Sequence, residues 1–279
     1  MHFSLEYLIS LFSWDLFLWP CFLAIVIGVC ILFLLLLALT ISQNTIPPKC
    51  RKRGSPTHLL VVLGSGGHTA EMFYMLRHMQ LDPRLYTYRT YLISSGDNFS
   101  AGKAEEFETQ HVQKLQGQAG NNNYTILAVP RARKVHQSYL TAPFSTLHCF
   151  WACLNVLRGL HPDQKLPKEF TSVYPDLILT NGPATAVCVV AAAKLIRFFL
   201  RAGKLAVSHL GLQPGFAISS VPKLRTIYIE SWARVDSLSM SGVLLLPLAD
   251  RFLVQWPAQA GRRAWWGMKR TQYAGWLVT

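Results

Sequence analysis

The sequence predicts an α/β protein that carries a parallel sheet and one N-terminal transmembrane helix. From residue 58 onward, short apolar runs alternate with longer segments of helical period, which is the pattern of a parallel sheet with helices on both faces. Polar or glycine-rich residues follow each apolar run. Residues 16–41 carry no charge and form an apolar run long enough to cross a bilayer.

The apolar run is interpreted as a membrane anchor over residues 1–48, with the spanning helix at about 16–41. A secretory signal peptide is the alternative, but such a peptide begins with a basic segment. Here Glu6 and Asp15 precede the run, without any Lys or Arg. Residues 3–14 are also apolar, and they either lie at the membrane interface or extend the anchor.

A basic linker over residues 49–57 follows the anchor and contains Lys49, Arg51, Lys52 and Arg53. The positive-inside tendency then places residues 58–279 in the cytosol, and the linker can also bind anionic headgroups. The chain has sequons at Asn98 and Asn123, which would carry glycans only in a luminal domain. We therefore expect both asparagines to be unmodified.

The composition limits the classes of ligand that the chain is expected to bind. The chain has 27 Lys and Arg against 14 Asp and Glu, a formal charge of +13, which suits nucleic acid, anionic lipid or a phosphate-bearing substrate. Without a nucleic-acid-binding motif, the last two are favoured. The six cysteines form no C-x-x-C pair, so we expect reduced thiols rather than disulfides or a metal site. No cofactor is expected.

The first strand is expected at residues 58–63, a continuous apolar run typical of a buried parallel strand. The helix at 69–80 follows from apolar residues at helical spacing. Further strands are expected at 91–93, 124–129, 176–180, 226–229 and 251–255, and further helices at 101–115, 142–160 and 184–200. Loops are expected at 116–123, 161–175 and 202–222, the last being rich in Gly, Ser and Pro. All lie in one Rossmann-like domain over residues 58–279.

Ligands of an open parallel sheet bind beyond the carboxyl ends of its strands. Five predicted strand ends carry residues suited to such a site, namely Gly64–His68, Ser94–Asp97, Pro130–Arg133, Asn181–Pro183 and Glu230–Ser231. In the first, glycines let backbone N–H groups approach an anion beside a helix N-terminus. The candidate phosphate-binding residues there are Gly64, Ser65, Gly66, Gly67 and Thr69.

The glycine-rich turn is neither of two common nucleotide motifs. A dinucleotide fingerprint needs a third glycine where Thr69 stands, and a P-loop needs Gly-Lys-Ser/Thr. A membrane-bound reductase is excluded on the same ground. A plain tight turn remains the alternative interpretation.

Three charged groups are further candidates. His68 titrates near neutrality and can act as a general base or as a phosphate donor; its place at a helix start favours the neutral ring. Arg131 and Arg133, with Lys134, either bind a diphosphate through forked hydrogen bonds or form a solvated basic loop. Glu230 is either a base or acceptor for sugar hydroxyls, or it caps the next turn.

The motifs together resemble one family. They are Gly64–Thr69, Pro130–Arg133 with Val135, Gln137 and Ser138, Asp176–Pro183, Tyr228–Ser231 followed by Arg234–Val235 and Leu238–Gly242, and Phe252–Pro257. This order of motifs, after a membrane helix, resembles that of the family of asparagine-linked glycosylation protein fourteen. That family is the membrane subunit of the transferase that adds the second N-acetylglucosamine (GlcNAc) to dolichol diphosphate.

The resemblance implies the acceptor-side half of a split GT-B glycosyltransferase. Its partner would be a soluble UDP-GlcNAc-binding catalytic subunit, asparagine-linked glycosylation protein thirteen, recruited to the endoplasmic reticulum. A preceding GlcNAc-phosphate transferase would be a further partner. The reaction would convert GlcNAc-PP-dolichol to chitobiosyl-PP-dolichol, and the chain alone would be inactive. A pure membrane scaffold without a substrate role is the alternative.

The resemblance also implies roles for residues. Gly66, Gly67 and His68 would face the cleft between the two subunits, with Glu230 at a position comparable to an acidic residue there. The acceptor-side candidates are completed by Arg131, Arg133, Asn181, Gly182 and Ser231. The C-terminal tail would dock the partner. Residues 262–270 depart from the family's usual ending, and residues 202–222 look like an insertion.

Overall fold

The N-terminal helix α1 comprises Leu5–Asn44 and contains Pro20. Within it, Leu18–Ala38 has a mean hydropathy of 3.2 and is long enough to cross a membrane. The computed structural model describes residues 5–44, 56–79, 85–112, 123–133, 137–138, 140–167, 170, 172–182, 184–209 and 223–278. The basic cluster at 49–53, Lys134, Val135, Pro183 and most of the expected insertion lie outside these residues.

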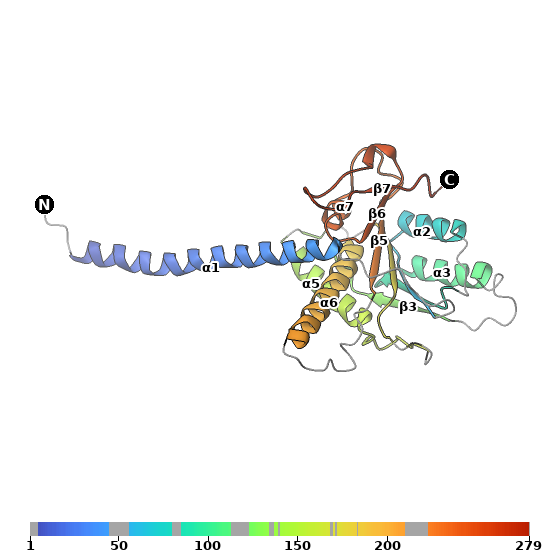
Figure 1. The fold of residues 1–279 in the computed structure, drawn as a ribbon, viewed down its shortest axis with the longest axis horizontal. Coiled ribbons are helices and arrows are strands. Elements are labelled where there is room, and N and C mark those ends of the chain that lie inside the picture. The colour runs from blue at the N-terminus through green and yellow to red at the C-terminus, as the bar shows by residue number, and fades with distance from the viewer. Residues whose placement is uncertain are drawn as a thin grey trace. The chain divides into compact units, whose positions relative to one another are not determined.

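The chain divides into two units, residues 1–41 and 42–279. The second unit is built on seven parallel strands in the order β3-β2-β1-β4-β5-β6-β7 (Figure 1). The strands are β1 His58–Val62, β2 Tyr88–Ser94, β3 Tyr124–Val129, β4 Leu177–Asn181, β5 Arg225–Ile229, β6 Arg251–Val254 and β7 Gln272–Tyr273. This confirms the predicted α/β fold, and the order of the first six strands is that of the Rossmann fold.

Helices cover both faces of the sheet (Figure 1). One face carries α2 and α3, and the other carries α5 and α6. The helices and helical turns are α2 Gly67–His78, α3 Asn98–Phe107, the π-helical turn η1 Glu108–Val112, α5 Ala142–Leu157, α6 Ala184–His209, α7 Met240–Leu245 and the 3-10 turn η2 Pro257–Gln259.

Strand β1 explains why both faces must be covered. Its residues Leu59 and Val61 pack under α2 and α3, whereas Leu60 and Val62 pack under α5 and α6. Each of these four side chains is at most 1% exposed. A strand that is buried on both sides needs the continuous apolar run that the sequence shows, rather than an alternating one.

Strand β2 and helix α6 are among the elements that extend beyond the sequence prediction. Strand β2 starts at Tyr88, three residues before the predicted start, because Arg89 is fully buried with a partner. Helix α6 runs to His209, so residues 202–209 are helical and not the loop that the sequence predicted.

Two further elements were not predicted. No helix was expected at residues 240–245, where the structure has helix α7 with Ser239 as its N-cap. The edge strand β7 was also missed, because it has only two residues.

The partner of Arg89 is Glu108 in η1. The Arg89 guanidinium donates to both oxygens of this carboxylate, from Nε at 2.6 Å and from a terminal nitrogen at 2.8 Å. The Tyr91 hydroxyl adds a third bond at 2.7 Å. Both charged side chains are at most 3% exposed. The pair therefore fixes η1 against β2 inside the core, where neither charge is stable alone.

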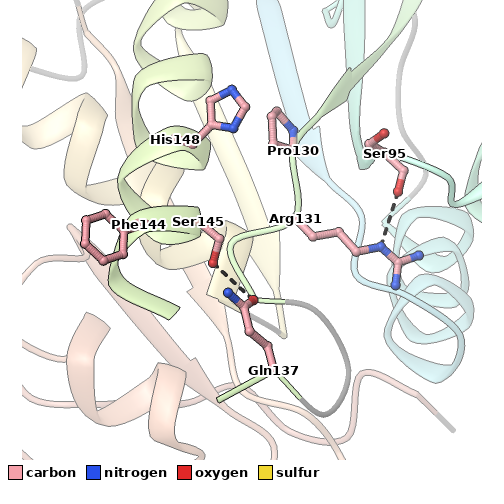
Figure 2. Close-up of a pocket in the computed structure, with 7 residues that line it drawn as sticks. All are labelled: Ser95, Pro130, Arg131, Gln137, Phe144, Ser145 and His148. Atoms are coloured by element: carbon pink, nitrogen blue, oxygen red, sulfur yellow. Dashed lines mark hydrogen bonds between the residues drawn. The ribbon is translucent and has the colours of Figure 1, made fainter. Parts of the chain in front are cut away.

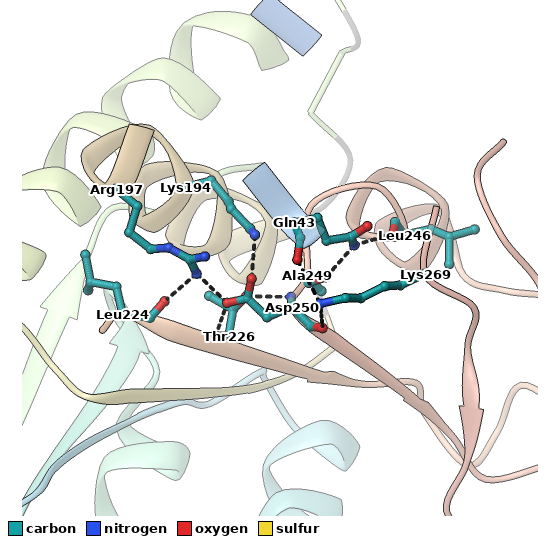
Figure 3. A network of polar contacts seen from close by, with 9 residues as sticks. All are labelled: Gln43, Lys194, Arg197, Leu224, Thr226, Leu246, Ala249, Asp250 and Lys269. Atoms are coloured by element: carbon teal, nitrogen blue, oxygen red, sulfur yellow. Dashed lines mark hydrogen bonds and ion pairs between the residues drawn. The ribbon is translucent and has the colours of Figure 1, made fainter. Parts of the chain in front are cut away.

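A second buried network surrounds Asp250, which directly precedes β6 (Figure 3). Lys194 and Arg197 of α6 form ion pairs with its two oxygens, and the Thr226 amide donates to it at 2.9 Å. Burial lowers the pKa of Lys194 to about 8, with the adjacent carboxylate opposing that shift. Asp250 thus holds α6 to the starts of β5 and β6.

The buried pair gives the first prediction. Replacing Glu108 by Gln keeps the side chain's shape but leaves the Arg89 charge uncompensated in the core, which costs about 3–5 kcal/mol of folding free energy. We expect a lower midpoint of unfolding in denaturant titrations followed by circular dichroism. The matched control is Glu106→Gln, because Glu106 pairs with Lys103 at the surface. The control should leave the midpoint unchanged, and equal effects of both variants would contradict the assignment.

Candidate functional site

The candidate site lies where the direction of strand order reverses. Strands β1 and β4 are neighbours, and the helices that follow them, α2 and α6, pack on opposite faces of the sheet. In a doubly wound sheet this arrangement opens a crevice beyond the carboxyl ends of the two strands. His68 stands in the first turn of α2, and Asn181 is the last residue of β4. The sequence therefore places both at this crevice.

Glu71 of α2 connects three strand ends. One of its carboxylate oxygens accepts a hydrogen bond from the Asn181 side-chain amide at 2.8 Å, and the other accepts from the Ser231 hydroxyl at 2.9 Å. The first oxygen also lies 3.8 Å from Nδ1 of His68. Residues after β1, β4 and β5 are thus held around one carboxylate. Burial alone would raise the pKa of Glu71, but the adjacent His68 and the hydrogen bonds from Asn181 and Ser231 together outweigh burial and lower it.

The His68 ring is fixed by Glu71 on one side and Gly182 on another. Gly182 has a φ of +84°, and a Cβ atom there would stand 2.6 Å from Cγ of the ring. Nδ1 is buried, although the side chain as a whole is 35% exposed. The ring therefore presents its opposite edge, which carries Nε2, toward solvent. Two requirements select glycine at position 182: the left-handed backbone and the space for the ring.

The pKa of His68 is shifted in the direction opposite to the sequence expectation. A helix start was expected to favour the neutral ring, but the Glu71 carboxylate raises the pKa of His68 above its ordinary value of 6.5. Partial burial opposes this shift and is the smaller effect, while Asn181 and Glu230 reinforce it. A nearby carboxylate in a partly desolvated site favours the protonated ring.

The contacts of Glu230 agree with the second interpretation, in which its carboxylate caps the next turn. It is 1% exposed, and its Oε2 accepts from the amide and the hydroxyl of Ser239 at 3.1 and 3.2 Å. The Ser231 amide donates to Oε1 at 3.2 Å. A Cβ at Gly242 would overlap Oε2 of Glu230. The carboxylate is thus enclosed between β5 and α7, behind the residues that bind Glu71.

The glycine-rich turn has an open side and a closed side. Gly66 adopts a φ of +61° and begins α2, and no atom lies within 4 Å of a Cβ built at Gly66 or at Gly67. Thr69 is on the closed side, fully buried, and its hydroxyl bonds to the Gly64 carbonyl and to Ser100. Thr69 thus stabilises the turn, while the exposed residues Ser65, Gly66 and Gly67 border the open space at the helix N-terminus.

Arg131 and Arg133 belong to a separate group. They follow β3, which is two strands away from β1 in the sheet. Arg131 donates from Nε to the Ser95 carbonyl at 3.2 Å, beside a pocket of about 990 Å³ between the ends of β2 and β3 and helix α5 (Figure 2). The pocket is lined by Ser95, Pro130, Arg131, Gln137, Phe144, Ser145 and His148. Arg133 instead donates to the Gln137 carbonyl at the pocket's rim.

Tryptophans gather next to the Glu71 group. The rings of Trp232 and Trp256 are 5.6 Å apart and those of Trp256 and Trp276 are 6.1 Å apart. Trp256 donates to the Trp232 carbonyl at 2.7 Å. Trp232 directly follows Ser231, and Trp232 and Trp276 are 40% and 57% exposed. These three residues, the Trp cluster, form an exposed aromatic surface beside the crevice.

Sequence reasoning singled out His68, Asn181 and Ser231 but missed Glu71, the residue that the structure places among them. Glu71 was not singled out, although its spacing of three residues from His68 puts both on one side of a helix. Gln255 was also missed, and it bonds to the Glu230 carbonyl at 3.1 Å and to the Leu277 amide at 3.1 Å, which ties the C-terminal segment to the site. That contact has no signal in the local sequence.

The fold and the site define a Rossmann-like domain whose polar residues meet at the switch point of a doubly wound sheet. Residues 59–277 match the model of one family, described as "Oligosaccharide biosynthesis protein Alg14 like". The chain belongs to this family, which confirms the resemblance drawn from its motifs.

Named relatives agree with this assignment. The chain is 56% identical over 227 residues to "UDP-N-acetylglucosamine transferase subunit alg14" of Aspergillus fumigatus, covering 74% of this chain and 100% of that protein. The Schizosaccharomyces pombe protein of the same name is 36% identical over 86% of this chain and 92% of its own length. The human "UDP-N-acetylglucosamine transferase subunit ALG14" is 34% identical, covering 72% and 76% of the two chains.

The contact between Gly182 and His68 gives the second prediction. In Gly182→Ala the new methyl group displaces the ring from Glu71, so the pKa of His68 should fall back toward its ordinary value. Histidine-ring NMR titration of the labelled chain in micelles measures this shift. Gly96→Ala is the matched control, because Gly96 has a φ of +78° but open space around it. The control pays the same backbone strain and should leave the His68 titration unchanged; a shift in both variants would contradict the assignment.

Proposed function

We propose that this chain is the membrane-anchored, acceptor-side subunit of a heteromeric UDP-GlcNAc transferase. The enzyme would transfer GlcNAc from UDP-GlcNAc to GlcNAc-PP-dolichol and give chitobiosyl-PP-dolichol. Membership of the family carries the proposal, since its named relatives are subunits of a UDP-N-acetylglucosamine transferase. The organisation would be residues 1–48 as anchor, 49–57 as basic linker and 58–279 as the acceptor-side half of a split GT-B fold.

The enzyme's active cleft would be completed by a second protein. The crevice at β1 and β4 is bordered by this one sheet, whereas a GT-B cleft is formed between two such domains. The soluble UDP-GlcNAc-binding subunit would supply the other side and would dock on the Trp cluster and the C-terminal segment. Large, exposed aromatic rings next to a site are suited to anchor a partner. The complex would act on the cytosolic side of the endoplasmic reticulum membrane.

His68 is the proposed catalytic base. In the transfer, the acceptor hydroxyl oxygen forms a bond to the anomeric carbon of the donor sugar, and the bond from that carbon to UDP breaks. UDP leaves with the bonding electrons, and the hydroxyl proton passes to Nε2 of His68. Glu71 stabilises the cation formed, and its contact at Nδ1 leaves Nε2 free to face the acceptor. The raised pKa makes the neutral ring a stronger base, which suits this role.

The acceptor's diphosphate has two sources of positive potential. Gly66 and Gly67 border open space at the start of α2, where the helix dipole favours an anion. Arg131 borders the pocket at β2 and β3, where its guanidinium can form forked bonds to phosphate oxygens. Asn181, Gly182 and Ser231 shape the site around His68. Because Glu230 is enclosed, we assign it a positioning role between β5 and α7 in place of the catalytic role expected from the sequence.

Substitution of His68 in the reconstituted pair of subunits tests the catalytic role. His68→Ala should lower turnover about 10²–10⁴-fold, the usual contribution of a general base. The control is His78→Ala, at the exposed end of the same helix, and it should retain full turnover. Sedimentation of the soluble subunit with membranes reports recruitment. Unchanged turnover in His68→Ala would favour the pure scaffold, whose only task is recruitment.

The pH profile tests the role of Glu71 separately. His68 accepts a proton only when neutral, so activity should fall as the pH drops through its pKa. Glu71→Gln removes the largest cause of the raised pKa, and the acidic limb of kcat/KM should therefore move to lower pH. Maximal turnover should fall as well, because the ring loses its orienting partner. A purely structural role for Glu71 would lower activity without moving the limb.

The orientation of the chain in the membrane can be tested separately. Asn98 and Asn123 should carry no glycan in cells, as judged by unchanged gel mobility after treatment with an N-glycanase. A sequon within a polar extension ahead of residue 1 serves as the control, because it should become glycosylated if the N-terminus is luminal. Glycans on either native sequon would place the globular unit in the lumen and contradict the proposal. Because the Ser100 hydroxyl is buried against Gly64 and Asp97, the readout at Asn123 carries more weight.

A further inference from the structure

A closed loop in the C-terminal segment exposes two tryptophans. Arg262 and Thr271 join its ends, since the Arg262 amide donates to the Thr271 hydroxyl at 2.9 Å and the Thr271 amide donates to the Arg262 carbonyl at 2.8 Å. We call residues 263–270 between them the Trp loop. Trp265 is 45% exposed and Trp266 is 85% exposed. The loop is distinct from the Trp cluster, which lies beside the crevice.

The composition of the Trp loop suits a membrane interface. Its sequence, RAWWGMKR, combines two indoles with the cations Arg263, Lys269 and Arg270 and has no acidic residue. Tryptophans concentrate at the headgroup level of bilayers, where an amphipathic ring contacts both apolar and polar material. Cations close to the surface are attracted by anionic headgroups. A protein partner also accepts Trp and Arg, so composition alone leaves two occupants.

The chain's own connectivity favours the bilayer. Lys269 of the Trp loop donates from Nζ to the Gln43 carbonyl at 2.7 Å (Figure 3). Gln43 is five residues beyond Ala38, the end of the apolar span. Five Cα–Cα steps reach at most about 19 Å in any conformation. If the span crosses a membrane, the base of the Trp loop must therefore stay near the headgroups, whichever direction α1 takes.

A second apolar surface borders the same glutamine. The Gln43 side-chain amide donates to the carbonyls of Leu246 and Ala249, directly after α7. On α7, Met240, Val243 and Leu244 are 71%, 58% and 53% exposed. Their spacing of three and four residues puts Met240 beside the other two on one side of the helix. Apolar side chains and indoles thus flank the residue that the chain holds close to the membrane.

We propose that the Trp loop, with the exposed face of α7, inserts into the headgroup region of an anionic bilayer. This second membrane contact rests on the proposed anchoring through α1. It would limit the rotation of the globular unit about its anchor and hold the crevice at a constant distance from a lipid-linked acceptor. One spanning helix alone fixes the distance of the unit from the membrane but not its orientation.

Lipid quenching of single tryptophans in the full chain tests the proposal. The chain is reconstituted into vesicles with phosphatidylserine, with or without lipids brominated near the headgroups. The emission of Trp266 is the difference between the wild type and Trp266→Phe, and we expect brominated lipids to remove most of it. The matched control is Trp276, an exposed tryptophan in the Trp cluster. Its emission is the difference between the wild type and Trp276→Phe, and brominated lipids should leave this emission unchanged. Reversal of both cations in Arg263→Glu with Arg270→Glu should reduce the quenching of Trp266.

Trp19 separates this proposal from the anchor. It lies in the apolar span, and its emission from Trp19→Phe should be quenched whenever α1 is inserted. Quenching of Trp19 without quenching of Trp266 overturns the second contact and leaves the anchor intact. No quenching of either overturns both. If Trp266 is instead shielded only when the soluble subunit is added, a protein occupies the Trp loop and the proposal is wrong.

Discussion

The site depends on one carboxylate that is shared among three strand ends. Glu71 lies on a helix, yet its two oxygens bind residues at the ends of β4 and β5, and its charge raises the pKa of a histidine that follows β1. Parallel strands bring their carboxyl ends to one edge, but they do not fix the side chains found there. A single acceptor with two oxygens does so here, because each oxygen has a different donor. If the histidine is catalytic, its basicity and its orientation have the same cause.

A second acid, Glu230, supports the residues that bind Glu71. Glu230 is enclosed by Ser239 and by Gly242, where even a methyl group would overlap it. Its charge also helps to raise the pKa of His68 from a distance. The two acids therefore differ in kind. One touches the histidine and is partly exposed, and the other stabilises the turn between β5 and α7 that supports the first one's partners. Both lie behind the histidine, so that its free edge faces the crevice.

Much of the fold was readable from the sequence, for a definite reason. Strands that are buried on both faces are continuous apolar runs bounded by polar turns, and the bounds of β3 were predicted without error. The start of β2 was missed because the burial of the charged Arg89 depends on Glu108, which is distant in the sequence. The end of α6 was misjudged because Gly203 suggested a loop. The local sequence pattern could indicate neither the long-range contact of Arg89 nor the continuation of helix α6.

The site was predictable to the same degree. Polar residues after successive strands were expected at one edge, and His68, Asn181 and Ser231 do meet there. Arg131 does not join them, because the position of β3 at the edge of the sheet is a property of strand order that no local motif encodes. Glu71 could have been found from its helical spacing, whereas the enclosure of Glu230 depends on α7, a helix that was not predicted.

Strand order has a consequence for how this chain matures. The second neighbour of β1 is β4, so the inner edge of β1 stays without its hydrogen-bonding partner until Leu177–Asn181 have left the ribosome. Through that interval a largely apolar segment is present with unpaired backbone groups, a condition that favours aggregation. Pairing of β1 with β2 can begin once residue 94 has emerged, which limits this exposure to one edge of β1.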